Sequence, residues 1–257
     1  PAEEGGGGAK RMMDEGLFER YPCDAVFAMH NVPGFEAGQL VFREGPTLAS
    51  ADRVVVTLTG IGGHGATPHK TIDPIVAAAS IVMALQTVVS RNVDPLQMAV
   101  VTVGMLVAGQ ASNIIPKMAA LELTVRTLDR AVQTLVERRI RALIEAQAQS
   151  FGVRSEIEWH RGYPVLVNTP AETEFARNVG AELLEEKGIT RHGPAIAAAE
   201  DFAFMLEQVP GSYVHIGNGT AANACHELHN ASYDFNDGNV TIGTAYWTLL
   251  AERFLGN

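Results

Sequence analysis

The sequence predicts an α/β protein in which a discontinuous domain, with helices covering a mixed sheet, is interrupted by an inserted β-α-β-β-α-β unit. The 257 residues correspond to roughly 1.7 domains of about 150 residues each. From Arg53 onward, segments with strand and helix periodicity follow one another in the order of that unit. On either side of it, helical segments alternate with short strand-like segments, which is typical of a sheet covered by helices.

The first half of the inserted unit is expected to contain three strands and one helix. Arg53–Thr59 is short and rich in β-branched residues, as a strand is. Asp73–Ser90 is Ala-rich and apolar at helical spacing, and its opening Asp-Pro pair is a typical helix start. Met98–Val107 and Met118–Thr127 are rich in Val, Leu and Thr, and the second alternates between apolar and polar residues. We therefore expect two more strands, the second with one polar face.

The second half of the unit is expected to contain a helix that starts at Asp129 and a closing strand over Val153–Trp159. The resulting order, β-α-β-β-α-β, is the ferredoxin-like arrangement. We assign it to residues 48–162. Residues 1–47 and 163–257 are then the two parts of the discontinuous domain.

The discontinuous domain is expected to alternate helices with short strands. Its expected elements are a short helix around Ala9–Phe18, strands Ala25–His30 and Gln39–Arg43, helices near Ala171–Glu186, Asp201–Gln208 and Val240–Phe254, and a strand over Ser212–Ile216.

Charge and composition argue against several classes of partner. Lys and Arg total 19 against 29 acidic residues, and the net charge of −10 repels nucleic acid and anionic lipid. The longest apolar stretch, Pro74–Val89, is shorter than the ~20 residues that span a bilayer. Two cysteines, Cys23 and Cys225, cannot form a disulfide framework, so we expect a cytoplasmic protein without membrane or nucleic-acid partners.

One glycine pattern is similar to a dinucleotide fingerprint. Gly60, Gly62 and Gly65 follow an expected strand with the required spacing. The fingerprint should open directly into a helix that receives the pyrophosphate, but Ala-Thr-Pro-His intervenes here. We therefore do not expect nucleotide binding. The loop instead presents His64 and His69, which suit a polar contact to a substrate or transition state.

The strongest candidate for chemistry is a set of carboxylates and imidazoles. Glu3 and Glu4 precede four glycines, His30 ends an apolar strand, and His229 lies in a polar loop. One carboxylate can bind a metal while its neighbour accepts a proton from water, as hydrolases with two metals require. Taken singly, each histidine is also compatible with an ordinary surface or core position.

Other catalytic patterns find little support. No G-x-S-x-G elbow and no paired cysteines at zinc spacing are present in the sequence. Glu200-Asp201 follows three alanines and is compatible with a helix-capping pair, with a role beside a metal ligand or with a role as a ligand.

These residues resemble the aminoacylase and carboxypeptidase metallopeptidase family, in particular its hippurate hydrolase and indole-acetyl-amino-acid hydrolase branch. The resemblance runs along the whole chain in several ordered motifs. They are Pro1-Ala2-Glu3-Glu4-Gly5, Met29-His30-Asn31, Gly62-Gly63-His64-Gly65-Ala66 with Pro68-His69, Asn113-Ile114-Ile115-Pro116, Val125-Arg126-Thr127, Glu200-Asp201-Phe202, and Leu228-His229-Asn230 with Asp234-Phe235-Asn236-Asp237.

The resemblance implies a metallopeptidase catalytic domain that holds two divalent metal ions (Zn, Mn, Co or Ni) and a ferredoxin-like lid that also forms a homodimer. It further implies a role for each matching residue. Glu3 would be the general base, Glu4, His30 and His229 metal ligands, His64 the group that polarises the scissile carbonyl in the partner subunit's site, and Asn113 and Arg126 the groups that hold the substrate carboxylate.

The implied reaction is hydrolysis of the amide bond of small N-acyl or N-aroyl amino acids, such as hippurate, by metal-activated water. Members of the family carry a Cys-Gly-His-type metal motif before the double glutamate, and nothing precedes Pro1 here. We therefore expect an N-terminally truncated chain that binds metal poorly by itself. Two alternatives stay open, namely a dipeptidase or carboxypeptidase of the same family and a non-catalytic dimerisation or binding module.

Overall fold

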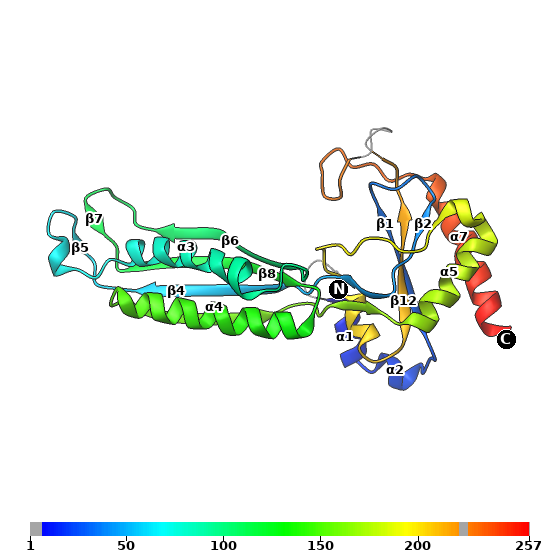
Figure 1. Ribbon diagram of the computed structural model, residues 1–257, viewed down its shortest axis with the longest axis horizontal. Coiled ribbons are helices and arrows are strands. Elements are labelled where there is room, and N and C mark those ends of the chain that lie inside the picture. Colours follow the sequence, from blue (N-terminus) through cyan, green and yellow to red (C-terminus); the bar gives the residue numbers. More distant parts are fainter. Residues whose placement is uncertain (1–6, 221–225, 257) are drawn as a thin grey trace. The chain divides into compact units, whose positions relative to one another are not determined.

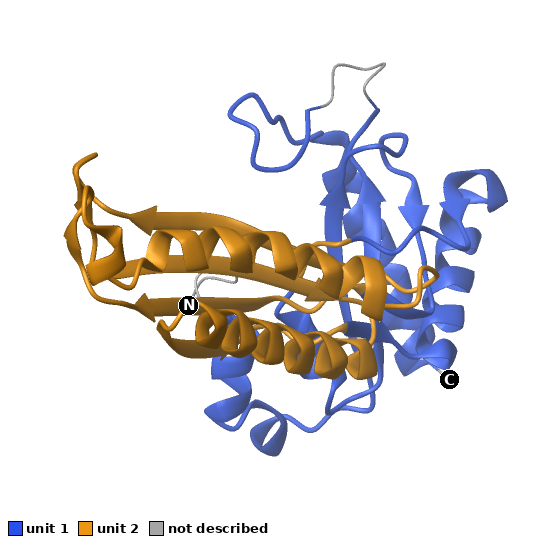
Figure 2. Ribbon diagram, turned by 60° about the vertical axis from the view of Figure 1, so that its left-hand side comes forward, with its two compact units in different colours: residues 1–47, 166–196, 200–257 blue, residues 48–165, 197–199 orange. Residues whose placement is uncertain are grey.

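The computed structural model describes residues 7–220 and 226–256 of the chain (Figure 1). Within them the chain divides into two compact units (Figure 2). Unit 1 comprises residues 1–47, 166–196 and 200–257, and unit 2 comprises residues 48–165 and 197–199. Glu3, Glu4 and Cys225 lie outside the described residues.

Unit 2 contains a four-stranded antiparallel sheet and two long helices. In chain order its main elements are β4 (Asp52–Thr59), α3 (Pro74–Asn92), β6 (Ala99–Ala108), β8 (Met118–Thr127), α4 (Arg130–Ser150) and β9 (Arg154–Arg161). The strand order in the sheet is β6-β8-β4-β9, and β6 is an edge strand. Two short strands, β5 (Gly63–His64) and β7 (Ile114–Ile115), pair with each other, and a 3-10 turn spans Pro68–Lys70.

Both long helices begin where a side chain satisfies their free amide groups. The Asp73 carboxylate accepts a hydrogen bond from the Ile75 amide at 2.8 Å, and Pro74 occupies the first helical position. Asp129 accepts bonds from the amides of Ala131 and Val132 at 2.8 and 2.9 Å. The expected helix starts at Asp73 and Asp129 are therefore confirmed.

The core of unit 2 lies between the sheet and the two helices, which cover the same face of the sheet (Figure 2). Alternate residues of β4 and β8 are buried there, and the intervening ones are more exposed, as expected for a sheet with one covered face. By length and hydropathy alone, one helix of the described residues, α3, could cross a membrane. It lies in this core, where Ala77, Ile81 and Leu85 are fully buried.

Unit 1 contains a second sheet with helices on both faces. Its elements are α1 (Gly8–Asp14), α2 (Leu17–Arg20), β1 (Val26–Val32), β2 (Leu40–Val41), β3 (Gly45–Leu48, whose last residue belongs to unit 2), β10 (Leu166–Asn168), α5 (Pro170–Leu184), a 3-10 turn (Glu186–Gly188), β11 (Ile189–Thr190), α6 (Phe202–Leu206), β12 (Gly211–Gly217) and α7 (Gly238–Leu255). The sheet order is β1-β12-β2-β11, and β10 pairs with β3. The first two strands are parallel, so the sheet is mixed, as expected.

The expected helix over Ala9–Phe18 is wrong as a single element. It is divided into α1 and α2 at Gly16, whose φ of +88° is a left-handed conformation that favours glycine. The expected helix over Asp201–Gln208 is present, but it is shorter than expected, because α6 begins at Phe202 and ends at Leu206.

The central strand β12 is buried along its whole length because helices cover both of its faces. Val214 and Ile216 join the core formed with α5 and α7. The residues that alternate with them along the strand, Tyr213 and His215, therefore point to the other face. Helix α6 covers that face, where the Phe202 ring lies 6.0 Å from the Tyr213 ring.

Candidate active site

Strands β1 and β12 bring two histidines and a tyrosine to one face of the sheet of unit 1. His30 is the register partner of His215, so their side chains share a face. The Tyr213 ring lies 6.5 Å from the His30 ring and 5.2 Å from the His215 ring. His30 is exposed near the carboxyl end of β1, the end at which parallel strands present ligand-binding residues.

A backbone contact orients the His30 ring. Its Nδ1 atom lies 2.6 Å from the carbonyl oxygen of Asn31. A carbonyl oxygen only accepts hydrogen bonds, so Nδ1 is the donor in this contact, and in the neutral imidazole Nε2 then keeps its lone pair. This arrangement is typical of metal-binding histidines, in which the second ring nitrogen donates to a carbonyl or carboxylate. His30 therefore fits the ligand role that its motif implies.

His215 has a different environment, since it is only 7% exposed. Burial, and secondarily repulsion from His30, lower the pKa of its imidazole from 6.5 to about 4. The ring is therefore neutral at pH 7 and adds no positive charge beside His30. His215 was not among the site residues predicted from the sequence. Its only signal was an imidazole within an otherwise apolar strand.

The loop that carries His229 is attached to the carboxyl ends of the same strands. The Asn31 side chain donates a hydrogen bond to the Tyr233 hydroxyl. Asn218, which directly follows β12, donates to the Asp234 carbonyl at 2.8 Å and accepts from the Asn236 amide at 2.9 Å. His229 itself is exposed, and its φ of +64° is uncommon for a residue other than glycine.

The remaining predicted ligand and the predicted base, Glu4 and Glu3, lie outside the described residues. Within residues 7–220 and 226–256, no group of three or more His, Cys, Asp or Glu side chains is arranged to hold a metal ion. Cys23 is exposed and free. A metal centre that includes His30 and His229 thus needs a further ligand, which is what the motif implies for Glu4.

Glu200 and Asp201 connect the start of α1 to the sheet face that carries His30 and Tyr213. The Glu200 carboxylate accepts a hydrogen bond from the Tyr213 hydroxyl at 2.8 Å. Asp201 is buried, and its carboxylate accepts a hydrogen bond from the Ala9 amide in α1 at 2.8 Å. Asp201 makes no side-chain cap on α6, the helix that it precedes. The Asp201 carboxylate therefore caps a helix other than the one its sequence position suggests.

Unit 2 brings His64 and Asn113 together. His64 pairs with Ile114 across β5 and β7, and the Gly65 amide donates to the Asn113 carbonyl at 2.8 Å. Both residues are exposed, and the His64 Nδ1 atom accepts a hydrogen bond from the Ala66 amide at 3.0 Å. The Nε2 atom of His64 therefore carries the hydrogen and can act as a donor.

Arg126 lies at the opposite end of unit 2 from these two residues. It is near the end of β8, whereas β5 and β7 lie where β8 begins (Figure 1). Met118 and Arg126 are eight residues apart on this strand, which corresponds to about 26 Å. The Arg126 guanidinium donates to the Ala197 carbonyl at 3.3 Å, three residues before Glu200. Asn113 and Arg126 of one chain therefore cannot hold the same carboxylate.

The glycines of the dinucleotide-like pattern allow backbone segments to pack closely. A Cβ atom on Gly60 would lie 2.1 Å from the Ile72 carbonyl oxygen, and one on Gly62 would lie 2.8 Å from that of Ile115. One on Gly65 would lie 3.2 Å from the Asn113 oxygen. These glycines place the His64 loop against the Asn113 loop, and no helix begins directly after them.

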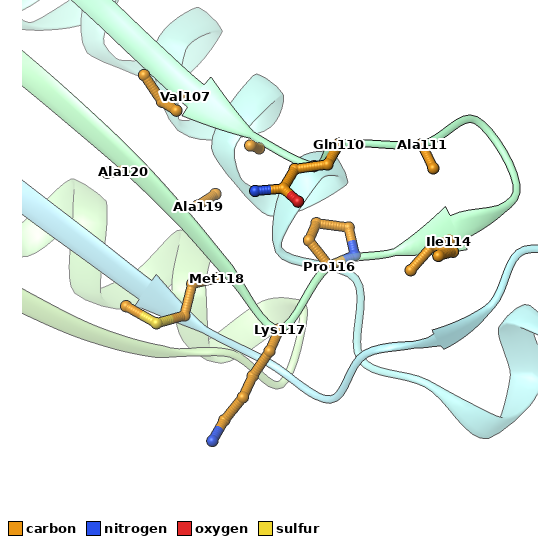
Figure 3. Close-up of a pocket in the computed structure, with 11 residues that line it drawn as sticks. Val107, Gln110, Ala111, Ile114, Pro116, Lys117, Met118, Ala119 and Ala120 are labelled. Carbon is orange, nitrogen blue, oxygen red and sulfur yellow. The ribbon is translucent and has the colours of Figure 1, made fainter.

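An apolar cavity of about 500 Å³ lies beside the Asn113 loop in unit 2 (Figure 3). Its wall includes Val107, Ile114, Pro116 and Met118. The Lys117 side chain points away from these residues in Figure 3.

Comparison with known proteins places these features in a family. The model of "Peptidase family M20/M25/M40" matches residues 1–253. Hippurate hydrolase of Campylobacter jejuni is 39% identical over 99% of this chain and 66% of that protein. N-acetyl-L-cysteine deacetylase of Bacillus subtilis is 35% identical over 99% of this chain and 59% of that protein. The chain thus spans about two thirds of the length of these relatives, or less.

A solved structure shows the same fold. The YXEP protein of Bacillus subtilis, described as a dinuclear metal binding peptidase from the M20 family, superimposes with a TM-score of 0.81 at 30% identity. The match covers 100% of this chain and 64% of that protein. The sequence motifs, the mixed sheet with His30 near the end of β1 and the matched family model agree, and the chain belongs to the M20 peptidase family.

Proposed function

We propose that the protein containing this chain is a metal-dependent amidohydrolase that cleaves the amide bond of N-acyl or N-aroyl amino acids. The observation that carries the proposal is the orientation of His30, whose Nδ1–H is held by the Asn31 carbonyl and whose Nε2 is left to bind a metal ion. Attachment of the His229 loop to the carboxyl ends of β1 and β12 supports a shared site. We also propose a cytoplasmic location.

Each residue of the site has a separate task in this proposal. His30, His229 and Glu4 hold divalent metal ions (Zn, Mn, Co or Ni). When bound, the metal ions act as Lewis acids that lower the pKa of water. Glu3 takes a proton from the attacking water, the water oxygen bonds to the amide carbon, and Glu3 returns the proton to the leaving nitrogen as the C–N bond breaks.

We further propose that unit 2 is a ferredoxin-like lid that pairs two copies of the chain. The geometry of one chain supports this, because His64 and Asn113 lie far along unit 2 from Arg126. In a two-fold dimer, His64 and Asn113 of one copy could act on a substrate whose carboxylate is held by Arg126 of the other. Exposed apolar residues on the edge strand β6, namely Met105, Leu106 and Val107, offer a surface for pairing.

The reaction is tested in the full-length protein, including any residues that precede Pro1. With Zn²⁺, Mn²⁺, Co²⁺ or Ni²⁺ added in turn, we expect hydrolysis of N-benzoylglycine or N-acetylcysteine. Faster cleavage of unmodified dipeptides would favour a dipeptidase. No hydrolysis with any of the four metals would favour a binding module. Glu3→Gln should keep the metal content and lower turnover at least ~10²-fold, whereas Glu4→Gln should lose metal.

Action of His64 in the partner's site is tested by mixing subunits. His64→Ala and Glu3→Gln should each be nearly inactive as homodimers. In a mixed dimer, one of the two sites combines an intact Glu3 with an intact His64, so activity should return to at most about half per mixed dimer. Mixed dimers that form but restore no activity would show that His64 acts within its own subunit or not at all.

A further inference from the structure

The apolar cavity beside the Asn113 loop lies within unit 2, and every residue that lines it belongs to that unit. Paired strands form part of its wall, where Val107 of β6 is the register partner of Ala120 of β8. The loop over residues 109–116 supplies further lining residues, and the pairing of β5 with β7 holds that loop in place. The volume of about 500 Å³ is typical of a site for a small molecule.

Large apolar side chains surround the cavity without being buried. Val107, Ile114 and Met118 are 56%, 57% and 52% exposed. Single exposed apolar side chains are ordinary, but a group of them around one cavity is typical of a surface that binds an apolar ligand. Ala120 shares a sheet face with Val107, its register partner, and its small side chain leaves space there.

The cavity offers little compensation for a charged ligand. None of its lining residues, all of which the structure describes, is acidic. Lys117 is the one charged residue among them, and its side chain points away from the others in Figure 3. Transfer of a carboxylate from water to apolar surroundings is costly. The cavity therefore disfavours the carboxylate of an N-acyl amino acid and suits an uncharged apolar group.

The position of His64 indicates which part of a substrate reaches this cavity. His64 and Ile114 are register partners in the antiparallel pair of β5 and β7, so their side chains lie on the same face of that pair. Because Ile114 lines the cavity, the imidazole adjoins one of its walls. In the proposed function His64 polarises the scissile carbonyl, whose carbon is bonded directly to the acyl group. The amino-acid side chain is farther away, beyond the amide nitrogen and the α-carbon.

We propose that this cavity binds the acyl group of the substrate and favours aromatic acyl groups over acetyl. The inference rests on the proposed function, which it extends by naming the acyl class. The cavity and His64 belong to the same unit, so they act on one substrate whether His64 serves its own subunit or the partner's. A benzoyl ring buries much more apolar surface than an acetyl methyl group does, which corresponds to at least a tenfold difference in kcat/KM.

The test compares kcat/KM of the full-length protein for N-benzoylglycine and N-acetylglycine. Ala120→Leu places a larger side chain in the cavity. Glu158→Leu, the control, adds the same side chain to the same open sheet face on β9, two strands away from β8. We expect the unsubstituted protein to prefer N-benzoylglycine at least tenfold. Ala120→Leu should lower this preference at least fivefold, and Glu158→Leu should keep it.

A second variant changes the cavity in the opposite direction. Met118→Ala enlarges it by truncating a side chain that is half exposed at the start of β8, so the fold should be retained. We expect Met118→Ala to raise kcat/KM for N-(2-naphthoyl)glycine at least threefold relative to that for N-benzoylglycine. An unchanged ratio would overturn the inference.

Other results would also overturn it. A preference for benzoyl no lower in Ala120→Leu than in Glu158→Leu would place the acyl group elsewhere. If Ala120→Leu changes the ratio of N-acetylphenylalanine to N-acetylglycine hydrolysis and keeps the acyl preference, the cavity binds the amino-acid side chain. If Ala120→Leu dissociates a dimer in light scattering and keeps the acyl preference, the cavity is part of a pairing surface.

Failure of the proposed function would be visible separately, as an unsubstituted protein that hydrolyses no N-acyl amino acid. In that case binding of benzamide, a neutral aroyl amide, decides. It is followed through the methyl NMR signal of Met118, which Met118→Ala identifies by its loss. A benzamide-dependent shift with an affinity at least tenfold weaker in Ala120→Leu, but not in Glu158→Leu, supports an aroyl-binding cavity. No shift, or equal affinity in Ala120→Leu, excludes it.

Discussion

Replacement of His215 by leucine should change how the stability of unit 1 depends on pH. His215 is buried in β12, and its pKa is lowered to about 4 chiefly by that burial. In the unfolded chain, histidine titrates near 6.5. Between these two values the unfolded state binds a proton that the folded state does not, so the contribution of His215 to stability falls as the pH falls. Leucine has a similar size and does not titrate.

The size of the effect follows from the two pKa values. A shift from 6.5 to about 4, at 1.36 kcal/mol per unit, corresponds to about 3 kcal/mol in total. This stability is present above pH 6.5 and is lost below it, with about 2 kcal/mol gone by pH 5. Below pH 4 both states are protonated, and His215 adds no further slope.

The two tryptophans allow the units to be observed separately, because Trp159 lies in unit 2 and Trp247 lies in unit 1. In a Trp159→Phe background, urea unfolding followed by Trp247 fluorescence reports on unit 1. The measurement is made on metal-free protein at pH 7.5, 6.0 and 5.0. His160→Leu, which removes an exposed histidine of unit 2, is the control.

We expect the unsubstituted chain to lose about 2 kcal/mol more stability than His215→Leu between pH 7.5 and pH 5.0. His160→Leu should keep the behaviour of the unsubstituted chain. If His215→Leu and the unsubstituted chain lose the same amount, His215 is not buried in its neutral form, and the reasoning is refuted.

Three further substitutions test other parts of the structure. Asp52→Ala leaves the Trp159 indole and the Gln133 amide without their buried acceptor, so urea unfolding followed by Trp159 should show a loss of about 2 to 3 kcal/mol, whereas Glu156→Ala, which loses a surface ion pair, should cost less than about 1 kcal/mol. His229→Gly should be about 1 kcal/mol more stable than His229→Ala in thermal unfolding, because only alanine is strained at the φ of +64°; equal stabilities would contradict this. Arg126→Ala should depress hydrolysis of N-benzoylglycine far more than that of its amide, because only the acid carries the charge that the guanidinium binds; equal losses would exclude a carboxylate clamp.

Elements with local signals could be predicted from the sequence. The Asp-Pro pair at residues 73 and 74 caps a helix through contacts within three residues, and the expected and observed starts of α3 agree. The alternation in Met118–Thr127 appears as alternate burial along β8. Both predictions depend on residues that are neighbours in the chain, which is why a single sequence suffices for them.

Features that depend on distant residues could not be predicted in this way. Strands β5, β7 and β11 have two residues each, too few to show a periodicity. The capping role of Asp201 depends on a helix 192 positions away, so its sequence position is equally compatible with a cap on its own helix. The neutral state of His215 depends on its burial, which elements distant in the sequence provide.

The separation of Asn113 from Arg126 along unit 2 also depends on residues distant in the sequence, because strand pairing sets it. This separation has a functional consequence. Sequence motifs suggest that Asn113 and Arg126 bind one carboxylate, because both belong to the same family pattern. Antiparallel pairing of β8 with β4 and β6 keeps the strand extended, so Arg126 lies about 26 Å from Met118, at the end of β8 that follows the Asn113 loop. A substrate the size of an N-acyl amino acid is much shorter than that separation. If both residues contact one substrate, they must come from two copies of the chain, so dimerisation is then a requirement of the chemistry and not only of stability.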